Sequence, residues 1–197
     1  DTDTFLIMAM SGMAMFLVAG AKWRDIGIII VTGIVLLAIV AMVRPYIMDR
    51  LTTFLDPSAD PLGSGYQIQQ SLIAVGSGGI SGRGFGQSIQ KFEYLPEPIG
   101  DSVFAVYAEE FGFLGSIVLI ASFIIMTLRG YRIANQAKDM FGSILVVGFM
   151  TLIVGQAFLN IGAMLAIAPL SGLPLPFISH GGTALMSTLA SLGIVLN

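Results

Sequence analysis

The stretch IGIIIVTGIVLLAIVAMV, residues 26–43, is continuously apolar and carries no charged side chain. A membrane-spanning helix needs about 20 predominantly apolar residues, so this stretch predicts a transmembrane helix. The composition points the same way, because 55% of the 197 residues are hydrophobic and 11% are charged, whereas soluble domains carry about a quarter charged residues. We therefore expect a polytopic membrane protein.

Other segments have the length and composition of membrane spans. The segment 102–128 is charged only at Glu109 and Glu110, and no Asp, Glu, Lys or Arg occurs from Met140 onward. That last run is too long for one span, and APLSGLPLPFISHGG, residues 168–182, divides it. We predict one all-α membrane domain, a bundle of five transmembrane helices at residues 4–21, 26–43, 102–128, 140–168 and 182–197.

Basic residues mark the two short connections: Lys22 and Arg24 in the first, and Arg129, Arg132 and Lys138 in the second. Short cytoplasmic loops are enriched in Lys and Arg, and a five-span chain places both connections on the same side. We expect that side to be cytoplasmic. The long connection 44–101 and the turn 169–181 would then be external.

The long connection does not have the composition of a disordered linker. Its opening, RPYIMDRLTTFLDPSADP (44–61), has an apolar stripe that predicts a short helix at the membrane interface. The next part, LGSGYQIQQSLIAVGSGGISG (62–82), is uncharged but too polar to span, which favours a re-entrant or interfacial segment. Non-helical backbone at membrane depth is tolerated only where protein or a watery cavity covers it, so this segment indicates a cavity.

The glycine-rich stretch GSGGISGRGFG (76–86) resembles a nucleotide-binding loop only superficially. It lacks the Gly-Lys-Ser/Thr of a Walker motif, and no strand precedes it. We interpret these glycines as residues that permit tight turns and close backbone approach. A weaker alternative stays open, in which backbone N–H groups and Arg83 hold a phosphate of a lipid headgroup.

Asp101 lies where the external connection meets the predicted third span. A carboxylate at the start of a helix is a good N-terminal cap, which gives it a structural interpretation. The polar residues before it, Lys91, Tyr94 and Glu97 among them, favour a functional one, because a cap needs no polar rim. Carboxylates with a suitable pKa serve as bases that deprotonate hydroxyl groups.

Glu109 and Glu110 lie two turns into the same span. Ionisable groups inside a bilayer are costly and indicate either function or pairing with neighbouring elements. We expect these two carboxylates to brace the bundle, with one of them facing its interior.

His180, in the motif SHGG, is the only histidine, and the chain has no cysteine. A typical metal site needs several such ligands, so His180 alone does not make one. The motif precedes a predicted span, where free backbone N–H groups attract anions. Ser179, His180 and Gly181 are therefore candidate substrate-binding residues, although a polar turn without a ligand is the simpler alternative.

Two long stretches carry a family resemblance: residues 55–115, from LDPSADPLGSGYQ to AEEFGFLG, and NIGAMLAIAPLSGLPLPFISHGGT, residues 160–183. They resemble the SEDS family of bacterial shape, elongation, division and sporulation proteins (RodA, FtsW and SpoVE). The opening DTDT resembles the end of the family's PDLGT motif, with Asp1 at its aspartate and Asp3 at a usual glycine. Two departures are Ile99-Gly100, where many members have His-Thr, and His180, where the family usually has Tyr.

The resemblance implies a ten-span peptidoglycan glycosyltransferase of the bacterial plasma membrane, of which this chain would be the last five spans. The substrate would be lipid II, polymerised on the external side together with a class B penicillin-binding protein and other elongation or division proteins. The family's essential aspartate falls on Asp101, which would act as the general base of an inverting transfer. Arg83, Lys91 and Glu97 would contribute to substrate binding, and a divalent cation is a further candidate for stabilising the leaving diphosphate. The resemblance implies no organic cofactor and no nucleic acid.

A function of another class stays open, namely a lipid II flippase or transporter. Intramembrane carboxylates and a central cavity would suit that role as well. The position of Asp101 in an external loop, rather than at the membrane midplane, favours the enzyme.

Overall fold

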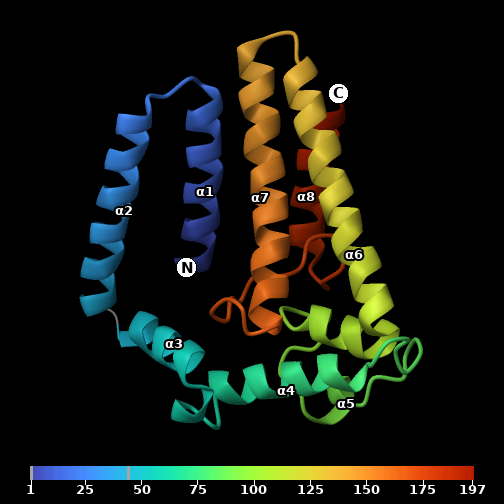
Figure 1. Cartoon of the computed structure of the whole chain (residues 1–197). Coiled ribbons are helices and arrows are strands. Elements are labelled where there is room, and N and C mark those ends of the chain that lie inside the picture. The colour runs from blue at the N-terminus through green and yellow to red at the C-terminus, as the bar shows by residue number, and fades with distance from the viewer. Residues whose placement is uncertain (1, 44) are drawn as a thin grey trace.

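The structure, a computed structural model, describes residues 2–43 and 45–197 (Figure 1). Within those ranges the ordered elements are helices, and there are no strands, so the prediction of an all-α fold is confirmed. Asp1, the residue matched to the aspartate of the PDLGT motif, lies outside the described residues.

Five apolar helices form the bundle: α1 (Thr2–Val18), α2 (Trp23–Val43), α6 (Val103–Gln136), α7 (Met140–Met164) and α8 (Gly182–Leu196). Three of them, α2, α6 and α7, are long and apolar enough to cross a membrane. The apolar helices α1 and α8 are shorter, at 17 and 15 residues, and lie where the first and fifth spans are predicted. The five-span prediction therefore agrees with the observed elements.

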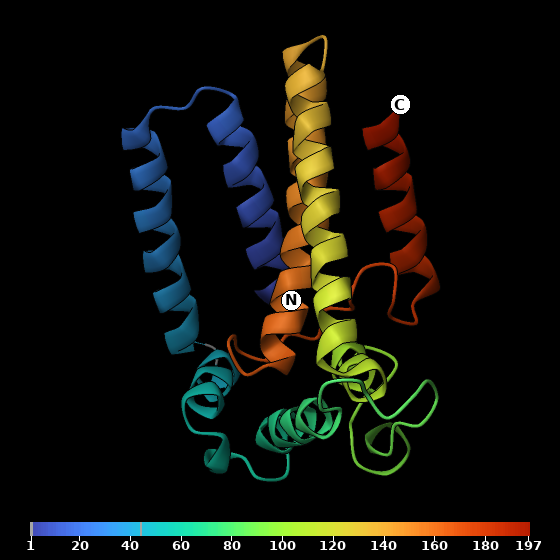
Figure 2. The same cartoon turned by 45° about the vertical axis from the view of Figure 1, so that its right-hand side comes forward.

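The connections between these helices lie at opposite ends of the bundle (Figures 1 and 2). The α1–α2 and α6–α7 turns are at one end. The segments 45–101 and 165–181 gather at the other end, as the predicted topology requires. Helix α1 packs on α7, and α7 packs on α6, whereas α2 buries little of its surface within the chain.

Four short helices form a layer across the second end of the bundle: α3 (Pro45–Leu55), η1 (Pro57–Ala59), α4 (Ser64–Ser77) and α5 (Gln90–Glu93). Helix α3 is the short helix expected in the stretch 44–61. Helix α4 is the uncharged segment expected at the interface, and it packs its buried face, including Ile68, Ser71 and Ala74, toward α6 and α7. The long connection is therefore structured, as predicted.

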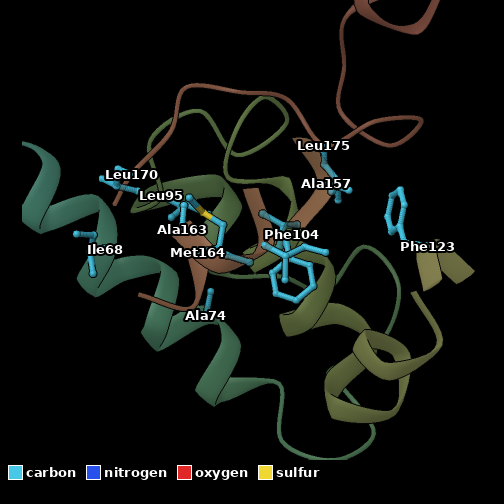
Figure 3. Packing of buried hydrophobic residues seen from close by; sticks show 13 residues of the cluster. Ile68, Ala74, Leu95, Phe104, Phe123, Ala157, Ala163, Met164, Leu170 and Leu175 are labelled. Carbon is cyan, nitrogen blue, oxygen red and sulfur yellow. The ribbon is translucent and has the colours of Figure 1, made fainter. Parts of the chain in front are cut away.

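A hydrophobic cluster joins this layer to the bundle (Figure 3). Phe104 of α6, Met164 of α7 and Leu175 of the 165–181 segment are at most 1% exposed and pack with Ile68 and other residues of the cluster. Burying a side chain of this size contributes about 1.5–3 kcal/mol. The cluster fixes the start of α6, and with it the residues that immediately precede Phe104.

Helix α6 is interrupted at Gly112, whose φ of 67° and ψ of −165° are not helical. The glycine-rich loop pairs with the interruption: Phe113 N–H donates to Gly79 O at 2.9 Å, and Arg83 N–H donates to Glu109 O at 3.0 Å. A Cβ on Gly82 would lie 2.1 Å from the carbonyl oxygen of Glu110. The interpretation of these glycines as sites of close backbone approach is thus confirmed.

Candidate active site

Asp101 occupies the short loop before α6, one residue ahead of the helix N-cap. The N-cap position belongs to Ser102, and α6 begins at Val103. The side chain of Asp101 instead accepts a long hydrogen bond, 3.4 Å, from the hydroxyl of Ser102. The interpretation of Asp101 as the helix cap is therefore wrong, because the helix starts one residue later than that role requires.

The half-buried position of Asp101 raises the pKa of its carboxyl group above the usual aspartate value. Loss of solvent is the main cause, and the negative charge of Glu97 adds to it, while hydrogen bonds from the side chains of Gln67 and Ser102 act in the opposite direction. Burial disfavours the charged form of a carboxyl group, and the resulting carboxylate is a stronger proton acceptor.

Asp101 opens into a pocket of about 390 Å³ between the end layer and the 165–181 segment. The lining side chains are mostly polar: Tyr46, Asp49, Arg50, Asp60, Ser64, Gln67, Asp101, Leu170, Ser171 and Gly172. The pocket therefore combines a proton acceptor, a guanidinium group and several hydrogen-bonding groups at the end of a membrane bundle.

Arg50 is the guanidinium of this pocket and was not among the residues singled out from the sequence. It forms an ion pair with Asp3 at the start of α1, and its guanidinium carbon lies 4.5 Å from the centre of the Tyr46 ring. The Arg50 side chain is 23% exposed, so it is largely desolvated. An arginine has five N–H donors, and the bond to Asp3 leaves others for a second acceptor.

The backbone around Asp101 is held by groups from the last third of the chain. Three consecutive carbonyls each accept one hydrogen bond: Ile99 O from His180 N–H at 2.8 Å, Gly100 O from Ser179 Oγ at 2.6 Å, and Asp101 O from Asn160 Nδ2 at 2.6 Å. The motif SHGG is thus adjacent to the Asp101 loop, although the contacts of His180 there are made by its backbone and its side chain is exposed.

Two more of the predicted substrate-binding residues, Glu97 and Gly181, lie in turns on either side of the Asp101 loop in the sequence. Glu97 has a left-handed φ of 45°, and its carbonyl accepts hydrogen bonds from Gly100 N–H and Ser102 N–H at 3.0 and 3.2 Å. It thereby closes the turn that presents Asp101. Gly181 has extended backbone and is the N-cap of α8, next to the turn that contacts Gly100.

Arg83 and Lys91 contact Glu109 and Glu110 of α6 rather than the pocket. Arg83 Nε lies 3.3 Å from Glu109 Oε1, and Lys91 Nζ lies 2.9 Å from Glu110 Oε1. Neither cation lines the Asp101 pocket. Their role in substrate binding stays a prediction, and the ion pairs they form are those expected of structural partners.

Glu109 makes further contacts of the kind that a bracing role predicts. It is fully buried and accepts hydrogen bonds from Ser88 Oγ at 2.6 Å and from the N–H groups of Ile89 and Gln90 at 3.2 Å each. These bonds hold the 88–91 segment against α6. A buried carboxylate is tolerable only with such partners.

The residues of the pocket do not form an obvious metal site. Among the residues that the structure describes, no group of three or more His, Cys, Asp or Glu side chains is close enough to hold a metal ion. One pocket carboxylate, Asp60, is used by the chain itself, accepting bonds from the N–H groups of Gly63 and Ser64. A divalent cation at this site stays a prediction.

Comparison with known proteins places the chain in a family. The family model described as cell cycle protein (FtsW, RodA, SpoVE) matches residues 1–197. Stage V sporulation protein E of Bacillus subtilis is 44% identical over 200 residues, covering 100% of this chain and 54% of that protein. Peptidoglycan glycosyltransferase MrdB of Escherichia coli K12 is 40% identical, also over 200 residues, with the same coverage.

Two solved structures share the fold. One, a peptidoglycan synthase complex described as coordinating polymerization and crosslinking, matches 97% of this chain and 53% of its own with a TM-score of 0.74 and 28% identity. The other, a mutant of the rod shape determining protein RodA of Thermus thermophilus, gives a TM-score of 0.59 at 25% identity. The chain spans about half the length of the curated relatives it matches. It belongs to the FtsW/RodA/SpoVE family of cell cycle proteins, which is the SEDS family that the sequence resembles.

Proposed function

We propose that the chain is the catalytic half of a peptidoglycan glycosyltransferase that polymerises lipid II, with Asp101 as the general base. The observation that carries the proposal is the half-buried carboxyl of Asp101, with its raised pKa, in a polar pocket at the end of a membrane bundle. The name of the relative MrdB, peptidoglycan glycosyltransferase, supports the activity.

The proposed reaction inverts the configuration of the donor sugar, which is α-linked to a lipid diphosphate and becomes β-linked in the product. Asp101 accepts the proton of the acceptor's 4-hydroxyl while that oxygen attacks the anomeric carbon. The bond between the anomeric carbon and the diphosphate oxygen breaks, and the diphosphate leaves with the electron pair. Inverting glycosidases use two carboxylates. A diphosphate leaves as an anion, so it needs positive charge rather than a second proton donor.

Arg50 is the residue of the pocket best suited to supply that positive charge. Guanidinium groups bind phosphate oxygens through charge-assisted, often bidentate, hydrogen bonds. Arg50 lines the same pocket as Asp101 and is largely buried, which strengthens its interaction with an anion. On substrate binding, the Arg50 guanidinium would either contact Asp3 and the diphosphate together or exchange Asp3 for the diphosphate. We assign the leaving diphosphate to Arg50 ahead of Arg83 and Lys91, because neither of those lines the pocket.

A groove between α1 and α2 offers a place for the lipid part of the substrate. It has a volume of about 860 Å³ and is lined almost entirely by apolar side chains, including Phe5, Phe16 and Ile29. A polyprenyl chain in this groove would leave its diphosphate and sugars at the end of the bundle where the pocket lies. The same groove would serve a flippase, so it supports a lipid-linked substrate without separating the two functions.

The proposed orientation rests on the basic residues of the chain, and the proposed partner rests on the description of a relative. The end of the bundle that carries Lys22, Arg24 and Arg129 would be cytoplasmic, because basic residues favour that side. The Asp101 pocket would then lie on the external face of a bacterial plasma membrane. A relative's structure is described as coordinating polymerization and crosslinking. We therefore propose a class B penicillin-binding protein, which cross-links the peptides, as the partner of the whole protein, alongside other elongation or division proteins.

The proposed function is tested with the full-length protein and purified lipid II in detergent. Formation of glycan strands, separated by gel electrophoresis, is the expected result. A flippase would instead move lipid II across proteoliposomes without polymerising it, and translocation without any glycan product would refute the enzyme assignment.

A further inference from the structure

Asn160 is a fully buried polar residue of α7, between the Asp101 loop and the 165–181 segment. It projects from α7 and donates hydrogen bonds from Nδ2 to Asp101 O at 2.6 Å and to Leu173 O at 2.8 Å. Two carbonyl partners determine which way the amide points, because the reverse orientation would place three oxygens together. The side chain thus ties the Asp101 loop to the 165–181 segment through α7.

The other amide atom of Asn160 shows that this arrangement has a cost. Oδ1 is buried and has no hydrogen-bond partner among the residues that the structure describes. An unsatisfied buried oxygen destabilises a protein and calls for an explanation. A residue that only filled space here would be apolar, and the two carbonyls would then lose their donor. The unpaired oxygen is consistent with a residue whose role is to donate hydrogen bonds from Nδ2 to the carbonyls of Asp101 and Leu173.

The bond to Asp101 O holds the backbone from which the Asp101 side chain projects. The carbonyls of Ile99 and Gly100 are also held, by His180 N–H and Ser179 Oγ, so three successive peptide groups are fixed from one side. Of these three contacts, the one from Asn160 acts on the residue that bears the carboxylate. Fixing its peptide group fixes the position of the Cα atom from which the side chain enters the pocket.

We propose that Asn160 is a positioning residue, which holds the backbone of Asp101 so that its carboxylate faces the acceptor hydroxyl. This inference rests on the proposed function. A displacement of about 1 Å at a reacting group can reduce the rate on the order of a hundredfold, which sets the size of the expected effect.

The test is steady-state kinetics of the full-length protein carrying Asn160→Leu, with purified lipid II as substrate. We expect kcat to fall about a hundredfold while KM changes little, because the substrate-binding groups stay in place. Asn160→Ser, whose hydroxyl can still donate one hydrogen bond, should retain intermediate activity and covers the case in which the leucine variant does not fold. The acidic limb of the pH–rate profile should move to lower pH in both variants, because a displaced Asp101 regains water. The other charged groups around it, Glu97, Asp49, Asp60 and Arg50, are the same in both variants.

Gln156 provides a matched control on the same helix. Its Nε2 donates to Pro174 O at 2.7 Å, so it secures the same 165–181 segment. Within the described residues, no hydrogen bond joins it to the Asp101 loop. Gln156→Leu should therefore keep nearly full kcat. An equal loss in Gln156→Leu and Asn160→Leu would show general loosening of that segment and overturn the inference.

The background variant Asp101→Asn separates this inference from the proposed function. If Asp101→Asn is inactive and folded Asn160→Leu or Asn160→Ser turns over like the unmodified protein, only the positioning role is refuted. If Asp101→Asn itself is active, the assignment of the base is refuted instead. If Asp101 is the base and Asn160 positions it, adding Asn160→Leu to Asp101→Asn should reduce the residual rate no further.

Discussion

The role assigned to Arg50 leads to a quantitative prediction for Arg50→Gln. Glutamine keeps a hydrogen-bond donor and most of the side-chain length but removes the positive charge that faces the leaving diphosphate. A hydrogen bond to a charged group contributes about 1.5–3 kcal/mol, and 1.36 kcal/mol corresponds to a factor of about ten in rate. The Arg50 side chain is 23% exposed, which argues against strong weakening by solvent. We expect kcat/KM for lipid II to fall by roughly ten- to a hundredfold.

The assay is glycan polymerisation by purified full-length protein, and Arg24→Gln is the control. Arg24 lies in the first turn of α2, where its side chain is 83% exposed and pairs only loosely with Asp25 at 3.7 Å. That end of α2 is opposite the end layer (Figure 1). Because Arg50 also pairs with Asp3, thermal unfolding should be measured for each variant. A folded Arg50→Gln protein with the same kcat/KM as Arg24→Gln would refute the assignment of the diphosphate to Arg50.

Three further predictions concern other parts of the structure. The rate should fall with decreasing pH at a value above the usual aspartate pKa, because Asp101 must be ionised to accept a proton and burial raises its pKa; an acidic limb at the ordinary aspartate value would contradict this. Gly82→Ala should destabilise the protein by about 2–4 kcal/mol, since its Cβ would meet Glu110 O at a φ of 79°, whereas Gly76→Ala, in open space within α4, should unfold at an unchanged or higher temperature. The double variant Arg83→Gln, Lys91→Gln should mainly lower thermal stability, and a loss of kcat/KM without loss of stability would restore these two cations to the substrate site.

The membrane helices and the end layer could be predicted because their signals are local. Long apolar runs predict α2, α6 and α7, and the apolar stripe of residues 44–61 predicts α3. The sequence also predicted that the glycine-rich loop approaches another backbone segment closely. The sequence did not predict that this segment is α6. The interruption of α6 at Gly112 depends on backbone hydrogen bonds with the glycine-rich loop, and no local sequence pattern signals it.

The candidate site was predictable only at Asp101. Arg50 belongs to α3, which was interpreted in the sequence from its apolar stripe alone. Its ion pair with Asp3 joins residues that are 47 positions apart in the sequence. Asn160 contacts Asp101 across 59 residues. A lone asparagine within an apolar run was the available signal for Asn160, since buried polar groups in membrane helices require a partner. The identity of that partner is a property of the tertiary structure.

The central claim is that Asp101 is the general base, and one substitution tests it most directly. Asp101→Asn preserves the size of the side chain and its hydrogen-bonding capacity, and Ser102 rather than Asp101 occupies the helix N-cap. Because burial disfavours the ionised carboxyl, the variant should be at least as stable as the unmodified protein at neutral pH. General-base catalysis contributes about 10²–10⁴-fold, so polymerisation of lipid II should fall by at least about two orders of magnitude in a folded protein. Glycan strands made by purified Asp101→Asn at nearly the unmodified rate would contradict the account.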